Sequence, residues 1–217
     1  MTTQNLPGTN AARHGTGDAD LTIMIAAHDA FRRDLTRLAR TASAAHDPAR
    51  RESVQAGWEL FKRQLLLHHT TEDEIIWPAL RARLAHSSTA LSVLAAMEAE
   101  HELIDPLLAA VDTAFARDEP PADVIGALTT SLTGHLAHEE RDGLPLIGVT
   151  LTAAEWRAAG RAMARKNGLS ASAEMFAWIL DGTDRVHRNA TLAKLPPPLR
   201  VLYRARWKPR FDKTPRW

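Results

Sequence analysis

The chain has 217 residues, a formal net charge of +1, 45% hydrophobic residues and 24% charged residues, which is typical of one globular domain with a smaller appendage. The near-zero charge gives no general argument for a nucleic-acid partner. The absence of cysteine excludes disulfides, thiolate metal sites and iron–sulfur clusters. The polar first residues lack the apolar segment of a secretory signal, and no run is long enough to span a membrane, so the expected location is the cytoplasm.

Four amphipathic helices are predicted after a disordered segment over residues 1–17. Within each, apolar residues recur at alternating steps of three and four and form a stripe that faces a core. The predicted bounds are Asp18 or Asp20 to about Ala42, Asp47 to about Ala85, Ser87 or Ser88 to about Phe115, and Pro120 or Pro121 to a break near Gly143 and Pro145. Short connections between these helices predict an all-α, antiparallel up-down-up-down four-helix bundle over residues 18–147.

A short helical extension is predicted over residues 148–217. Thr152 to Glu155 forms a capping-box pattern for a fifth helix that ends near Asn167 and Gly168, and a sixth helix is expected over Ser170–Leu180. The basic, aromatic tail has two interpretations. Its aromatic side chains pack on the bundle while its arginines pair with acidic residues, or the tail docks weakly on a membrane, a nucleic acid or a protein. The tail residues concerned are Arg200, Tyr203, Arg204, Arg206, Trp207, Lys208, Arg210 and Phe211.

Two segments share one motif. HHTTEDEIIWP, from His68, and HLAHEERDGLP, from His135, both place a glutamate one helical turn after a histidine, and both end in proline. Two further histidines sit in the middle of the other two bundle helices. All six side chains fall on core-facing stripes, where an unpartnered polar group costs about 2–7 kcal/mol and a charge costs more. The sequence therefore predicts a metal site with the ligands His28, His68, Glu72, His101, His135 and Glu139.

The spacing from the loops supports this site, because residues of antiparallel helices meet when they are equally far from the connecting loop. His28 is about 18 residues before the first loop and His68 about 20 after it, which matches within about one turn. Glu72 and His101 are each about 14 residues from the second loop, and His101 and His135 each about 17 from the third. Three separate loops thus place all six groups in one layer.

The ligand set restricts the metal. Nitrogen and carboxylate donors without sulfur suit iron or manganese, and zinc less specifically. Two carboxylates from opposite helix pairs suit a dinuclear centre with bridging carboxylates, with a mononuclear or zinc site as the alternative. Six protein donors cannot saturate two six-coordinate irons, so positions stay open for O2, nitric oxide or peroxide.

On these residues the chain resembles the hemerythrin HHE cation-binding family over about Asp18 to Leu146. The resemblance implies a non-haem centre of two irons with oxo or hydroxo and carboxylate bridges, and roles in O2 binding or sensing, nitric-oxide or peroxide handling, or iron homeostasis. Oxygen-carrying hemerythrins supply two histidines in an H-x-x-x-H pattern on the third helix, whereas this chain has His101 and Asp105. The difference weakens the case for simple reversible oxygen carriage. Asp105 is expected to accept a hydrogen bond beside the ligands or, alternatively, to bind the metal.

The remaining candidate groups are assigned supporting or solvated positions. His69 and His138 are predicted to be partly exposed or to support the ligands without touching the metal. Asp73 and Glu140 are expected at the surface or hydrogen-bonded to ligand imidazoles. The histidines predicted to be solvated are His14, His46, His86 and His187.

Three functions follow from the predicted site. The first is binding or sensing of a small diatomic ligand, which the extension relays or modulates. The second is an enzyme that consumes peroxide, and the third is iron storage or delivery. No strong acid–base pair stands out beyond the ligands, which favours the first.

Overall fold

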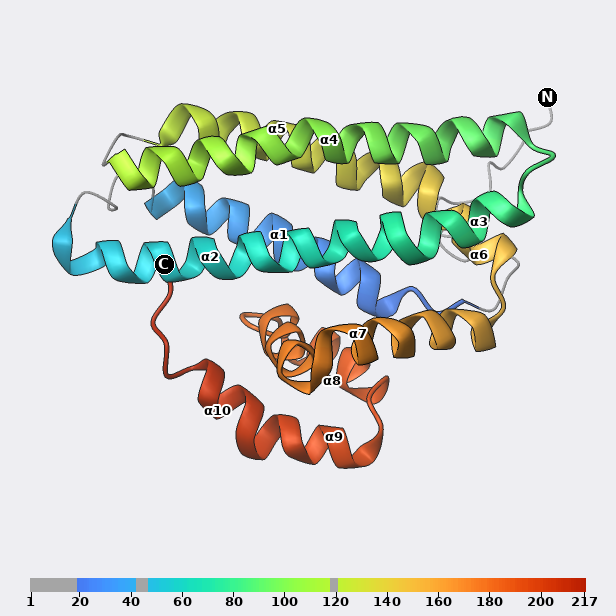
Figure 1. The fold of residues 1–217 in the computed structure, drawn as a ribbon. Coiled ribbons are helices and arrows are strands. Elements are labelled where there is room, and N and C mark those ends of the chain that lie inside the picture. Colours follow the sequence, from blue (N-terminus) through green and yellow to red (C-terminus); the bar gives the residue numbers. More distant parts are fainter. Residues whose placement is uncertain (1–18, 42–46, 118–120) are drawn as a thin grey trace, which may run out of the picture.

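The computed structural model describes residues 19–41, 47–117 and 121–217, and every regular element in these ranges is helical. Four long helices lie side by side and alternate in direction, as Figure 1 shows. They are α1 (Thr22–Thr41), α2 (Pro48–Thr71), α4 (Ser88–Arg117) and α5 (Ala122–His138). The predicted all-α, up-down-up-down bundle is therefore confirmed.

Helix boundaries follow from local capping chemistry. Asp20 accepts the backbone N–H of Thr22 at 3.1 Å, and Asp47 accepts the backbone N–H of Ala49 at 3.0 Å ahead of Pro48. Helix α4 runs on through Pro106. Several predictions concern positions outside the described residues, namely those for residues 1–17 including His14, for Asp18, Ala42, His46 and Pro120.

Three prolines are each preceded by a π-helical turn. These turns are η3 (Glu72–Ile76) before Pro78, η4 (Glu139–Gly143) before Pro145 and η5 (Tyr203–Trp207) before Pro209. Proline has no N–H, and its ring clashes with the carbonyl four residues earlier, so it disrupts the regular α-helical ladder. The backbone shifts instead to wider bonds, such as Trp77 N–H to the Glu72 carbonyl. Glu72 and Glu139 therefore each open a π turn.

The π turns correct one prediction from the sequence and shift the buried face of the helix. The helix break expected near Gly143 and Pro145 is wrong, because the chain continues through η4 into α6 (Leu144–Thr150). The predicted continuation of the second helix to about Ala85 is confirmed, because α2 passes through η3 into α3 (Trp77–Arg83). Each π turn adds a residue to the turn and moves the inward face by one position. Ile76 is consequently buried, whereas Ile75, which the regular pattern places in the core, is half-buried.

The extension begins with the capping box that the sequence predicts. The Thr152 side chain accepts the N–H of Glu155, and the Glu155 carboxylate accepts the N–H of Thr152. Gly168, with φ of 80°, divides the helix at the predicted boundary, because glycine adopts this left-handed conformation without steric cost. The elements are α7 (Ala153–Ile179), α8 (Arg185–Ala193), α9 (Pro197–Leu202), η5 and α10 (Lys208–Phe211).

The extension and the bundle share one hydrophobic core. Trp178 packs on Phe31 of α1 with ring centroids 4.8 Å apart, and both rings are buried. Tyr203, Trp207 and Phe211 are also buried in this core, so the predicted packing of the tail's aromatic residues is confirmed. Among the residues that the structure describes, the expected pairing of the arginines with acidic residues is not seen at Arg200, which donates to the Leu195 and Ala193 carbonyls. Arg204, Arg206 and Arg210 are exposed, and docking through them stays a prediction.

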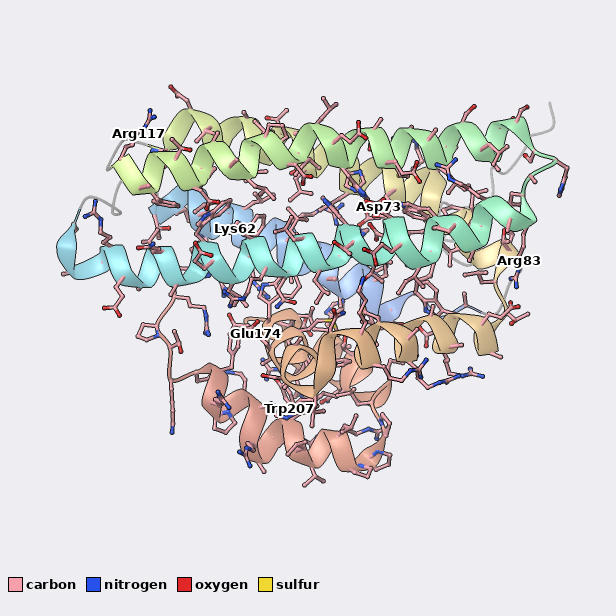
Figure 2. The ribbon with its side chains drawn as sticks, in the orientation of Figure 1. Lys62, Asp73, Arg83, Arg117, Glu174 and Trp207 are labelled. Atoms are coloured by element: carbon pink, nitrogen blue, oxygen red, sulfur yellow. The ribbon has the colours of Figure 1, made fainter. Side chains whose placement is uncertain are left out.

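Polar contacts fix the extension across α1 and α2. Asp34 is buried and accepts the indole N–H of Trp178 at 2.7 Å. Glu174 accepts a hydrogen bond from Arg63 of α2 at 3.0 Å, and Figure 2 shows Glu174 at this junction. The carboxyl terminus then returns to α2 (Figure 1), where the Trp217 ring occupies the space that a side chain on Gly57 would need.

A second cluster of buried apolar residues fills the end of the bundle around Trp77, Met97 and Leu144. No helix in the described parts of the chain is both long enough and apolar enough to cross a membrane.

Candidate metal centre

The bundle brings all six predicted ligands together in its interior. His28 lies in the amino-terminal half of α1 and His101 in the middle of α4. The two H-x-x-x-E turns lie where α2 and α5 pass into their π turns. Glu72 and Glu139 have no exposed surface at all. The loop spacing therefore predicted the layer correctly. That these side chains bind metal stays a prediction at this point.

One group of donors joins α1 and α2 to both carboxylates. Its members are His28, His68, Glu72 and Glu139, and one donor atom from each lies within 4.8 Å of the others. The Nε2 atom of His28 is 3.1 Å from Glu139 Oε2, and the Nε2 atom of His68 is 3.2 Å from Glu72 Oε1. The carboxylate oxygens of Glu72 and Glu139 have no hydrogen-bond donor among the described residues. A cation is the partner that this group lacks.

A second group joins α2 to α4 and α5. It consists of His69, His101 and His135, whose donor atoms also lie within 4.8 Å of one another. The Nε2 atoms of His101 and His135 are 3.2 Å apart. Glu72 lies between the two groups, because its Oε2 is 3.5 Å from His101 Nε2 while its Oε1 faces His68. The two oxygens of this carboxylate therefore face imidazoles of different groups.

Outer carboxylates orient three of the imidazoles. Glu140 lies 2.9 Å from Nδ1 of His28, and Asp73 lies 3.0 Å from Nδ1 of His101, so both contact predicted ligands as expected. Glu100 lies 2.8 Å from Nδ1 of His135. A carboxylate on Nδ1 fixes the tautomer that leaves Nε2 free, and in each ring Nε2 faces the interior.

The charges of the interior are strongly coupled. Burial by itself would lower the pKa of His28, but Glu139 and Glu140 outweigh it and raise that pKa to about 9. Burial and repulsion from Glu139 raise the pKa of Glu72 well above its ordinary range. Burial, with repulsion from neighbouring histidines, holds the pKa of His68 well below its usual value. A proton on His28 and a metal ion therefore compete for the same pair of carboxylates.

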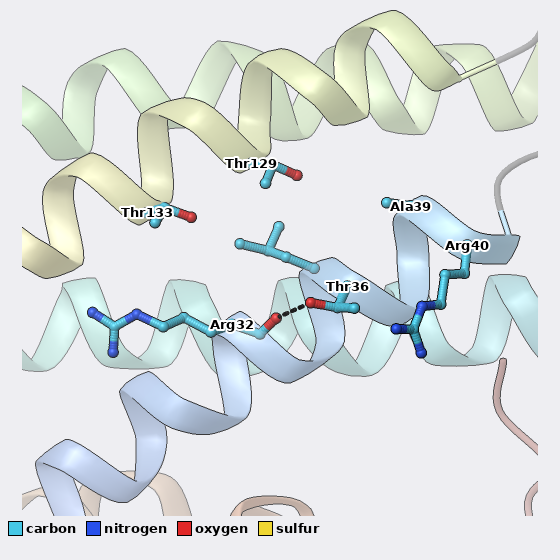
Figure 3. Close-up of a pocket in the computed structure, with 7 residues that line it drawn as sticks. Arg32, Thr36, Ala39, Arg40, Thr129 and Thr133 are labelled. Atoms are coloured by element: carbon cyan, nitrogen blue, oxygen red, sulfur yellow. Dashed lines mark hydrogen bonds between the residues drawn. The ribbon is translucent and has the colours of Figure 1, made fainter.

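Glu140 is part of a chain that reaches the surface. Burial would raise its pKa, but hydrogen bonds from His28 and Arg32 lower it to about 2. Arg32 donates to Glu140 at 2.7 Å and also lines an open groove of about 520 Å³ between α1 and α5. Figure 3 shows Arg32 and Arg40 along one wall of this groove and Thr129 and Thr133 on the other. The groove contains none of the predicted ligands.

Asp105 does not occupy the place expected for it, since it is exposed on the outer side of α4. The residues buried on this helix, such as Ile104 and Leu108, put His101 at one edge of the inward face. Four residues advance the helix by about 40° beyond a full turn, which carries Asp105 further outward. The expectation that Asp105 accepts a hydrogen bond beside the ligands is therefore wrong.

The other histidines are placed largely as predicted. His138 is partly exposed and hydrogen-bonded to Glu100 at 2.6 Å, while His86 and His187 are exposed. His69 differs, because only 4% of its surface is exposed. The sequence analysis also missed Glu100, which contacts both His135 and His138. Its position directly before His101, on the side of α4 that packs on α5, is the signal that could have identified it.

Fold and site together define a helical-bundle protein with a candidate metal centre of buried imidazoles and carboxylates. The donors fit a cation, because buried carboxylate oxygens face imidazole nitrogens and lack hydrogen-bond donors in the described parts of the chain. Residues 19–147 match the hemerythrin HHE cation binding domain. This match spans more than half of the sequence, so the chain belongs to the hemerythrin HHE family. Comparisons with curated proteins and with solved structures gave no match.

Proposed function

We propose that the chain is a di-iron protein that binds O2, nitric oxide or a related small oxidant and serves in sensing or in the response to oxidative or nitrosative stress. The observation that carries this proposal is the pair of adjacent donor groups with Glu72 between them. Two bound irons would supply redox-active centres with open coordination positions for such a ligand. Nitrogen and carboxylate donors without sulfur favour iron over copper or a structural zinc.

The chain's own residues would hold the irons in unequal surroundings. His28, His68 and both glutamates serve one position, and His101 and His135 serve the other, with Glu72 facing both. Glu140, Asp73 and Glu100 fix the imidazole tautomers from outside.

A ring of α1 that packs on both a predicted ligand and the extension supports a sensing role. The ring of Phe31 lies 5.2 Å from the ring of His68 and 4.8 Å from the ring of Trp178. Trp178 belongs to α7, and its indole N–H is held by Asp34 of α1. A change in the position of His68 on ligand binding would therefore press on the extension through one packed ring.

The test uses the full chain loaded anaerobically with ferrous iron and titrated with nitric oxide and, separately, with O2. The expected result is a long-lived optical adduct together with altered hydrogen exchange in peptides that cover residues 169–180. The variant Phe31→Leu serves as the matched control, because it keeps the core filled and removes the ring between His68 and Trp178. It should form the adduct without the change in exchange. An adduct that leaves the exchange of the extension unaltered in the unsubstituted chain would contradict the sensing role.

A second candidate, consumption of peroxide, is favoured by a chain of hydrogen-bonding groups that leads inward from the surface. His138 lies 3.3 Å from Asp142 and 2.6 Å from Glu100, and Glu100 in turn contacts His135. Such a chain could carry protons, which reduction of peroxide requires. Sustained turnover of many peroxides per site, lowered in His138→Ala at unchanged iron content, would support the enzyme. Inert iron would exclude it.

A further inference from the structure

We infer that His69 is a seventh protein ligand of the centre, the third imidazole beside His101 and His135. This inference rests on the proposed di-iron function and adds to its ligand set a residue that the regular helix pattern leaves out. It makes α2 the one helix that supplies an imidazole to each of the two metal positions.

The ring of His69 is buried without a polar partner. Both of its nitrogens are inaccessible, and neither has a hydrogen-bond partner in residues 19–41, 47–117 and 121–217. The other imidazoles of the second group have their Nδ1 atoms occupied by carboxylates. Burying an unpaired polar group costs about 2–7 kcal/mol, so a conventional core position would carry an apolar residue. The unpaired nitrogens are explained if one of them binds a metal ion.

Three helices direct their imidazoles into one space at this point. The rings of His69 and His101 stack with centroids 3.9 Å apart and an interplanar angle of 9°. The ring of His135 meets His69 edge-on, at 5.4 Å and 83°. One donor atom of each of these three imidazoles lies within 4.8 Å of the other two, so all three can face a single metal ion.

The adjacency of His68 and His69 explains how one helix reaches both groups. Successive residues of an α-helix point about 100° apart. His68 accordingly meets His28 of α1, with ring centroids 5.1 Å apart, whereas His69 meets His101 of α4. A single histidine at this level of α2 could serve one position alone.

The second metal position needs such a donor because α4 contributes one imidazole and no more at this level. Asp105, one turn after His101, is exposed and points away from the centre. Without His69, the second position has His101, His135 and the shared Glu72, against two imidazoles and two carboxylates in the first group. With His69, three imidazoles from α2, α4 and α5 surround the second position.

The first experiment counts iron per chain in the full-length protein after anaerobic loading with ferrous iron alone. His69→Ala is compared with the unsubstituted chain and with His138→Ala, which removes a histidine from Glu100 without touching the interior. We expect about two irons in the unsubstituted chain and in His138→Ala, and about one in His69→Ala. Two irons bound equally tightly by His69→Ala would overturn the inference. Helical content of the metal-free variants, measured by circular dichroism, checks that each is folded.

The second experiment needs no substitution and so stays decisive if His69→Ala fails to fold. The unsubstituted chain, labelled with nitrogen-15 histidine and loaded with cobalt(II), is examined by NMR for imidazoles shifted by the paramagnetic metal. Five directly bound rings are expected, and four would overturn the inference. A chain that binds only one metal contradicts the di-iron proposal. If that metal shifts the rings of His101 and His135, a shifted third ring supports His69 as a ligand, and an unshifted His69 ring rejects it.

Discussion

Replacement of Trp178 by phenylalanine tests whether the extension and the bundle form one folding unit. The substitution keeps an aromatic ring against Phe31 and removes the indole N–H that Asp34 accepts at 2.7 Å. Asp34 is 1% exposed, so its Oδ2 loses this donor with little access to water. Loss of a hydrogen bond to a charged group costs about 1.5–3 kcal/mol, and the smaller ring adds up to about 1.5 kcal/mol. The expected loss of stability is about 2–4 kcal/mol.

The assay is urea unfolding of the metal-free chain, followed by circular dichroism and by tryptophan fluorescence. Because the core contains residues of both parts, both probes should report one transition, and Trp178→Phe should move it to lower urea without splitting it. Trp156→Phe is the control, since this indole also lies in α7 but donates to the Asp20 carbonyl at an exposed site. It should cost about 1 kcal/mol or less. A Trp178→Phe cost no larger than that of the control, or two separate transitions, would refute the reasoning.

Three further predictions concern the centre itself. Gly143→Ala should lower the iron content, because a Cβ at this position would lie 3.1 Å from Cγ of Glu139. Gly134→Ala, which has open space around it, should bind iron normally, and equal iron contents in the two variants would contradict the prediction. Glu100→Gln should weaken iron binding about 10–100-fold in a chelator competition, and an unchanged affinity would remove Glu100 from its orienting role. The pKa of His28, raised from 6.5 to about 9 in the folded metal-free chain, stabilises the fold below pH 6.5. Unfolding at several pH values should lose about 3 kcal/mol of this stability as the pH rises from 6.5 through 9, and the iron-loaded chain, where metal replaces the proton, should lose far less.

The sequence predicted the fold and the layer of the site because the governing signals are local. The spacing of apolar residues by three and four positions, the helix start at Asp47–Pro48 and the Thr152 capping box each act within a few residues. The position of the layer needed loop lengths in addition, which set the register of antiparallel helices. The meeting of His28 with His68, at 5.1 Å between ring centroids, follows from that register.

The π turns could not be predicted from regular periodicity. A break after Gly143 was the simplest expectation for Pro145, yet packing of Leu144 and Ile147 in the core holds the chain helical beyond the proline. The same local widening decides that Ile76 rather than Ile75 is buried. The burial of His69 and the exposure of Asp105 depend on how far α2 and α4 rotate about their axes, and tertiary packing sets these rotations.

The most direct test of the account is elemental analysis of the full chain produced in iron-replete medium, with Mössbauer spectroscopy on the same sample. The account predicts about two irons per chain, magnetically coupled through shared bridges. A reproducible single zinc, with no iron taken up on reconstitution, would contradict it.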